Sequence, residues 1–218
     1  MPKEPNSRKT AGGTSLDKVN LMVVDGSAKS GELIKSILVE LGFNNVFIAS
    51  DGYQGVKMIR EKHIDLVFTD WELFVLKKPL LAADPAESSD VPKADAEIKP
   101  EIKPEIKPLN GALFVKRLRG STSSPNPFIP VIMLLPKVND NDIAEARDAG
   151  VNEIVLKPFC AGDLCQKVIS IIDKPRIFVT SGTYKGPCRR LAATPLPKES
   201  SERRIREIRL IRIDEHRR

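Results

Sequence analysis

The stretch Asp65-Leu-Val-Phe-Thr-Asp70-Trp71 joins an apolar run of strand length to an acid. An acid at the carboxyl end of a buried strand lies at the edge where α/β sheets place their functional groups. The earlier apolar run 20–24 also ends on an acid, Asp25, and the later run 153–156 leads into Lys157. Two carboxylates and one lysine at strand ends predict a small charged crevice suited to a metal ion and a phosphoryl group.

Apolar runs alternate with helical patterns on both sides of this stretch. Strands are predicted at 20–24, 46–49, 66–69, 131–135 and 153–156, and helices at 31–41, 52–62, 110–119, 140–149 and 162–172. Alternation with short connections is typical of parallel sheets covered by helices on both faces. We therefore predict an α/β fold with a doubly wound, five-stranded parallel sheet.

The pattern predicts one domain at 18–173, between a disordered segment at 1–17 and a basic tail at 174–218. A low-complexity insertion at 76–108 interrupts the domain after the third strand and ends in three copies of Glu-Ile-Lys-Pro, at 97–108. Proline at every fourth position excludes a regular helix and removes strand donors, which favours an extended spacer. Two interpretations stay open, an insertion without function and a docking motif.

Composition excludes several classes of protein. Hydrophobic residues make up 41% of the chain and aromatic residues only 5%, so Val, Ile and Leu must form the core. No apolar run approaches the roughly 20 residues of a membrane span, and the N-terminus lacks a signal peptide, so we expect a cytoplasmic protein without a transmembrane segment. Cys160, Cys165 and Cys188 are odd in number and lack metal-ligand spacing, which argues against a disulfide framework and a zinc site.

The net charge of +6 is unevenly distributed along the chain. Residues 174–218 carry 13 Lys or Arg against 5 Asp or Glu, a net charge of +8, whereas residues 1–173 carry a net charge of −2. The excess of positive charge therefore belongs to the tail and indicates an anionic partner for that segment.

Five short motifs, in this order along the chain, resemble the receiver domain of response regulators, of the chemotaxis-regulator type. They are Val23-Val24-Asp25, Thr69-Asp70-Trp71, Pro130-Val-Ile-Met-Leu134, Ala149-Gly150-Val151-Asn152 and Lys157-Pro158-Phe159. The resemblance covers about residues 19–173 outside the insertion. It implies the flavodoxin-like receiver fold and a bacterial two-component phosphorelay.

The resemblance also implies roles for particular residues. Asp70 would accept a phosphoryl group from a phosphohistidine, and Lys157 would bond that group. The cofactor would be Mg²⁺, held by Asp25, Asp70 and the carbonyl of Glu72. The protein would be a phosphoacceptor and not an enzyme. Its partners would be a sensor histidine kinase or phosphotransfer protein and a downstream protein target.

Three positions depart from the receiver pattern. Gly26 stands where receivers usually have a second metal-binding acid, Leu135 stands at the position of the switch hydroxyl, and Ile154 replaces an aromatic residue. Two interpretations follow, a receiver that is still phosphorylated and a pseudo-receiver that keeps the fold for binding. A third is that Asp70 and Asp25 only cap neighbouring helix N-termini.

The tail offers a further candidate site. Tyr184, Gly186-Pro187 and Arg189-Arg190 resemble the arginine-rich extension of receivers that bind cyclic di-GMP. Arginine pairs with phosphates and stacks on purines, as does tyrosine, and a solvated basic tail is the alternative. Residues 201–212 suit a basic helix for RNA, an anionic membrane or a partner groove, without a helix-turn-helix, so we predict no DNA-binding domain.

Overall fold

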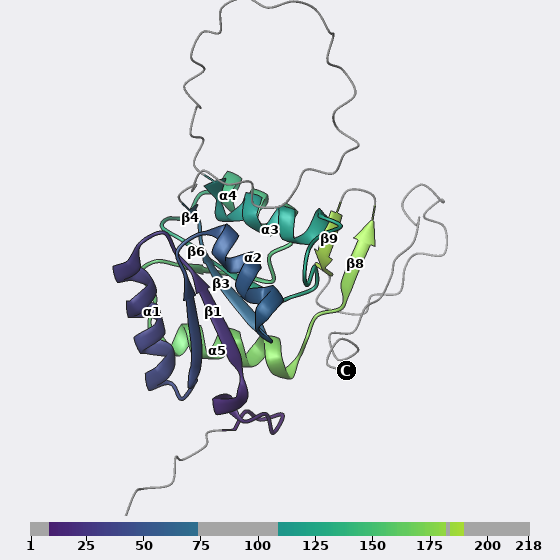
Figure 1. Ribbon diagram of the computed structural model, residues 1–218. Coiled ribbons are helices and arrows are strands. Elements are labelled where there is room, and N and C mark those ends of the chain that lie inside the picture. The colour runs from purple at the N-terminus through teal and green to yellow at the C-terminus, as the bar shows by residue number, and fades with distance from the viewer. Residues whose placement is uncertain (1–8, 74–108, 182–183, 190–218) are drawn as a thin grey trace, which may run out of the picture.

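The computed structural model describes residues 9–73, 109–181 and 184–189 (Figure 1). Its main sheet has five strands in the order β2-β1-β3-β6-β7, and all four pairings are parallel. The strands are β1 (Asn20–Val24), β2 (Asn45–Ala49), β3 (Leu66–Asp70), β6 (Val131–Leu135) and β7 (Glu153–Leu156). The predicted doubly wound α/β fold is confirmed.

Five helices follow these strands in the predicted order, one after each strand. They are α1 (Ala28–Glu40), α2 (Gly52–Glu61), α3 (Gly111–Gly120), α4 (Asp140–Ala149) and α5 (Ala161–Asp173). The N-terminus of α1 lies three residues before the predicted one. The apolar stripe begins only at Leu33, whereas the helix begins after Ser27, whose side chain accepts a hydrogen bond from the backbone N–H of Ser30. The N-cap, which is polar, therefore sets the start of the helix.

Both faces of the sheet are buried, as continuous apolar strands predict. In β1, Leu21 and Val23 pack in one cluster with residues of α1 and α5. Met22 and Val24 pack in a second cluster with residues of α2, α3 and α4. Two helices therefore cover one face of the sheet and three cover the other (Figure 1).

A two-stranded ribbon follows β3 that the sequence analysis did not predict. Its strands, β4 (Glu72–Leu73) and β5 (Leu109–Asn110), pair in antiparallel fashion, and Leu73 is buried. The predicted insertion 76–108 lies outside the described residues. Because β4 and β5 pair, Leu73 and Leu109 lie next to each other at the two ends of the intervening segment. Helix α3 therefore begins close to the end of β3.

A hairpin of β8 (Phe178–Ser181) and β9 (Tyr184–Pro187) lies beside α3 and α4 (Figure 1). The sequence analysis assigned these residues to the basic tail outside the domain, whereas in the structure they pack against it. Phe178 is 1% exposed, and its ring meets the ring of Phe128 edge-on at a centroid distance of 5.8 Å. The buried ring of Phe178 anchors the hairpin because its burial removes a large apolar area from water.

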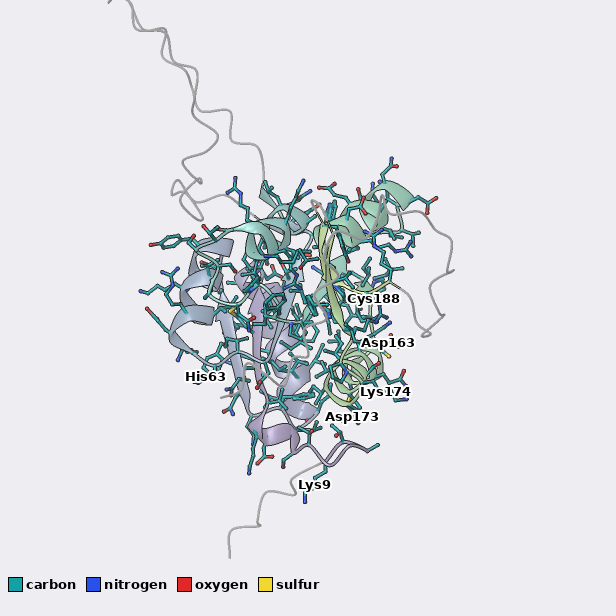
Figure 2. All side chains as sticks on the ribbon, turned by 90° about the vertical axis from the view of Figure 1, so that its right-hand side faces the viewer. Lys9, His63, Asp163, Asp173, Lys174 and Cys188 are labelled. Carbon is teal, nitrogen blue, oxygen red and sulfur yellow. The ribbon has the colours of Figure 1, made fainter. Side chains whose placement is uncertain are left out.

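Residues 9–17, assigned to the disordered N-terminal segment, also belong to the fold. Thr10 is buried, and its hydroxyl donates a 2.5 Å hydrogen bond to Asp173, which also accepts from the N–H of Gly12. Figure 2 labels Lys9 and Asp173 toward the same lower end of the molecule. Asp173 is the last residue of α5, where a carboxylate is unfavourable unless other donors compensate it. The domain therefore begins before the predicted residue 18.

Candidate functional site

Asp70 and Lys157 meet at the carboxyl edge of the sheet, as predicted. The Nζ atom of Lys157 donates to Asp70 Oδ1 over 2.9 Å, and the backbone N–H of Trp71 donates to the same oxygen over 2.9 Å. β6 lies between the strands that carry the two residues, a separation of about 10 Å that the lysine side chain spans. Within the described residues, Oδ2 of Asp70 has no hydrogen-bond partner.

The electrostatics of Asp70 indicate an incompletely compensated charge. Its side chain is 12% exposed, and burial raises the pKa of the carboxyl above its ordinary value. The hydrogen bond and positive charge of Lys157 oppose this rise, while the nearby carboxylate of Asp25 adds to it. One lysine therefore does not balance the negative charge of this edge, and a further cation would be favoured there.

Asp25 is 2% exposed and accepts two hydrogen bonds from the start of α1. The backbone N–H of Ser27 donates to Oδ1 over 2.8 Å, and the hydroxyl of Ser30 donates to Oδ2 over 2.6 Å. The sequence analysis missed both serines. The signal was a Ser-x-x-Ser pattern directly after the first strand, which is typical of a capped helix start.

The donor set fits a Mg²⁺ ion that keeps most of its water. Mg²⁺ commonly binds one or two carboxylates together with waters and phosphate oxygens, and Asp25 and Asp70 are near enough to repel each other. Within the described ranges, no three His, Cys, Asp or Glu side chains form a metal-binding group. The carboxylate of Glu72 is exposed and forms no such group with Asp25 and Asp70 in the described structure; a contact through the Glu72 carbonyl stays a prediction.

The position of the switch residue is apolar, as the sequence indicates. Leu135 ends β6 fully buried, and Ile154 packs against the same core cluster. The hydroxyl nearest to the acceptor along the chain belongs to Thr69, which is buried and donates to the carbonyl of Asp70 over 3.2 Å. A hydroxyl relay from position 135 is therefore absent from this protein.

The start of α3 packs directly on the backbone of Asp70. The N–H of Gly111 donates to the carbonyl of Trp71 over 2.7 Å, and a Cβ on Gly111 would lie 2.2 Å from the carbonyl oxygen of Asp70. Asn110 caps α3 and donates to Glu145 of α4 over 2.8 Å. The sequence analysis did not single out Gly111, although an Asn-Gly pair before a helix signals a tight approach of the backbone.

The candidate residues Tyr184 and Arg189 lie at the C-terminal end of α4, away from the edge of the sheet that holds Asp70. The guanidinium of Arg189 stacks over the ring of Tyr184 at 4.8 Å and donates to Asp148 over 2.5 Å. They border a groove of about 500 Å³. Its lining residues are Arg147, Val151, Asn152, Glu153, Ile154, Arg176, Tyr184, Pro187 and Arg189. Arg190 lies outside the described residues.

None of the helices that the structure describes is long and apolar enough to cross a bilayer. No family model matches the sequence. Curated relatives do: the chain is 24% identical over 156 residues to the chemotaxis protein CheY-3 of Vibrio cholerae, a match that covers 72% of this chain and 93% of that protein. It is equally identical to the chemotaxis protein CheY of Pseudomonas aeruginosa, over 72% of this chain and 98% of the relative.

A solved structure gives the same answer for the fold. A response regulator of Chloroflexus aurantiacus aligns with a TM-score of 0.51 and 20% identity, over 72% of this chain and 98% of that one. Its likeness supports the strand order and helix layers described above. The chain therefore has CheY-like response-regulator proteins as homologues and has the fold of its structural neighbours among receiver domains, with an atypical insertion after β3.

Proposed function

We propose that this chain is a stand-alone response-regulator receiver that accepts a phosphoryl group on Asp70 and signals by protein–protein contact. The observation that carries the proposal is the 2.9 Å pair between Lys157 and Asp70 Oδ1, with Oδ2 left without a hydrogen-bond partner in the described structure. The donor would be the phosphohistidine of a sensor kinase or phosphotransfer protein, in the cytoplasm. The chain would act as an acceptor and not as an enzyme on other molecules.

The geometry suits an in-line transfer to Asp70. Oδ2 forms the new bond to phosphorus while the bond from phosphorus to the histidine nitrogen breaks and that nitrogen keeps the electron pair. Trp71 and Lys157 hold Oδ1, which leaves Oδ2 as the attacking atom. As charge moves onto the phosphoryl oxygens, the ammonium of Lys157 is near enough to turn from Oδ1 to one of them.

A Mg²⁺ ion bound by Asp25, Asp70 and the Glu72 carbonyl would supply the remaining compensation of phosphoryl charge. The support for this part of the proposal is that the carboxylate of Asp25 lies near Asp70, where it adds to the rise in the Asp70 pKa that burial produces. Asp25 contributes from the end of β1, where the hydrogen bonds from α1 fix its position. With Gly26 beside it, no second acid from β1 takes part.

The proposed output surface is that of α4 and β7. Because Leu135 has no hydroxyl to follow the phosphoryl group, the change in shape after phosphorylation should be smaller than in a receiver with a switch residue. A pseudo-receiver that only binds a partner would, in contrast, behave the same with and without the Asp70 carboxylate.

The test is the intact mass of the protein after incubation with Mg²⁺ and acetyl phosphate. We expect one phosphoryl adduct on the wild type and none on Asp70→Asn, with a reduced yield for Lys157→Met. Circular dichroism of each variant controls for folding. An adduct on Asp70→Asn, or none on a folded wild type, would contradict the proposal and favour the pseudo-receiver.

A second candidate function is binding of cyclic di-GMP at the groove beside the hairpin. The observation that favours it is the stack of Arg189 on Tyr184 next to Arg147 and Arg176, because guanidinium groups bind phosphates and aromatic faces bind purines. Calorimetric titration should then show binding that the double variant Arg189→Ala/Arg190→Ala loses and Asp70→Asn keeps. Equal binding by the double variant and the wild type would exclude this site.

A further inference from the structure

Asp25, the buried acid directly after β1, accepts a hydrogen bond from the side chain of Ser30, which has no role in the proposed phosphotransfer. Asp25 is 2% exposed and accepts one hydrogen bond on each oxygen, from the N–H of Ser27 and from the hydroxyl of Ser30. Two bonds on different oxygens fix both the rotamer and the plane of a carboxylate. Since a carboxylate has about four lone-pair positions, others remain for a cation.

The orientation of Asp25 matters more here than it would beside a second acid. Gly26 contributes no carboxylate, so Asp25 is the single acid from the β1 side of the site. A buried carboxylate at a helix start is also attracted toward the free N–H groups of that helix. Without a fixed rotamer, Asp25 could turn toward α1, and the site would retain only Asp70 as a ligand.

Ser30 and Ser27 do not contribute in the same way. Ser27 donates through its backbone N–H, which almost any residue would provide, and its own hydroxyl caps α1. Ser30 donates through its side chain over 2.6 Å. The bond to Oδ2 therefore depends on the residue type at position 30.

We propose that Ser30 is the positioning residue for Mg²⁺ binding at this site, because its hydroxyl holds Asp25 in the orientation that presents a free lone pair toward Asp70. The inference rests on the proposed function of that site. Residues that hydrogen-bond a metal ligand commonly change metal affinity by 10- to 100-fold when they are removed. We expect the effect of Ser30 to lie in that range since no neighbouring acid replaces Asp25.

The test measures Mg²⁺ affinity directly. Trp71 is the sole tryptophan of the chain and donates to Asp70, so its fluorescence reports on the site; calorimetry gives an independent measurement. We expect the Kd for Mg²⁺ to rise about tenfold or more in Ser30→Ala. Ser30→Thr keeps the hydroxyl and should restore affinity to within about threefold of the wild type.

Ser36→Ala is the matched control, because Ser36 is an exposed serine of the same helix whose hydroxyl bonds only the carbonyl of Glu32. It should leave the Kd unchanged. If Ser30→Ala fails to fold, Ser30→Val and Ser30→Thr provide an isosteric pair that differs by the hydroxyl. Equal Kd values for Ser30→Ala and wild type, equal values for that isosteric pair, or no Mg²⁺ binding by the wild type in both measurements would overturn the proposal.

The mass measurement separates this inference from the proposed function. A Kd that rises in Ser30→Ala without any phosphoryl adduct on the wild type would leave the positioning role standing and refute phosphotransfer. An adduct on the wild type together with an unchanged Kd in Ser30→Ala would support phosphotransfer and refute the positioning role of Ser30.

Discussion

The edge of the sheet that holds Asp70 and the contact between Arg119 and the hairpin each contain a buried or half-buried charged side chain, and the two charges are compensated to different extents. Asp70 keeps one oxygen without a hydrogen-bond partner in the described structure, and burial raises its pKa. Arg119 at the end of α3 is 2% exposed, and burial lowers its pKa to about 9, which still leaves it charged at neutral pH. Within the described residues no carboxylate pairs with Arg119.

Oxygen atoms of the described residues accept four hydrogen bonds from the guanidinium of Arg119, which carries five N–H groups. Its guanidinium donates to the carbonyls of Gly150 and Pro127 and to the side-chain oxygen of Asn152, and it lies 5.0 Å from the ring of Phe178. The compensated charge of Arg119 therefore joins α3, the end of α4 and β8. The comparison teaches that incomplete compensation, as at Asp70, distinguishes a site for chemistry from a structural contact.

The largest expected effect tests the contact that Arg119 makes with the hairpin. Arg119→Ala should lower the free energy of unfolding by about 3 kcal/mol, since it leaves buried carbonyls without donors and removes packing under Phe178. Urea denaturation measures the change. Arg117→Ala, an exposed arginine of the same helix, should change stability by no more than about 0.5 kcal/mol; similar losses in the two variants would contradict the structural role.

The second largest effect concerns Gly111, whose backbone packs against Asp70. Gly111→Ala should destabilise the fold by about 2 kcal/mol and reduce the phosphoryl adduct on Asp70, because the new Cβ would overlap the Asp70 carbonyl. Gly120→Ala, at the other end of α3, has no neighbouring atom within 4 Å and should be nearly neutral. Unfolding curves and intact mass of both variants make the comparison, which an unaffected Gly111→Ala would break.

The smallest expected effect is a gain in stability, in contrast to the losses expected for the other two variants. Asp70→Asn should raise the free energy of unfolding by about 1 kcal/mol at pH 7, because it removes a charge that burial disfavours. Since the folded pKa of Asp70 lies above the unfolded value of 3.8, the folded state binds the proton more tightly. The wild type therefore loses stability relative to the variant as the pH rises from the unfolded pKa of Asp70 through its higher folded pKa.

Below pH 3.8 the carboxyl is protonated in both states, so the difference between the two proteins should disappear. Thermal or urea unfolding of both proteins from pH 3 to 8 measures this. A variant that is less stable than the wild type at pH 7 would mean that Lys157 compensates Asp70 fully, and the contrast with Arg119 would then fail.

Local patterns predicted the main elements well. The bounds of β1, β6, β7 and α4 agree with the predicted ranges residue for residue, because apolar runs and caps act within a few neighbouring residues. The ribbon of β4 and β5 was missed since its two-residue strands carry no periodic signal. The hairpin was missed because a single buried phenylalanine does not outweigh a polar segment in any local pattern.

The amino-acid sequence by itself determined that acids and a lysine stand at the ends of β1, β3 and β7, since strand ends follow from local hydrophobicity. Only the tertiary structure decided how Asp25 is held, how closely Gly111 approaches Asp70, and that Arg119 meets Phe178. The last two contacts join residues about 40 to 60 positions apart in the chain. Such contacts depend on strand order and helix placement, which no window of neighbouring residues contains.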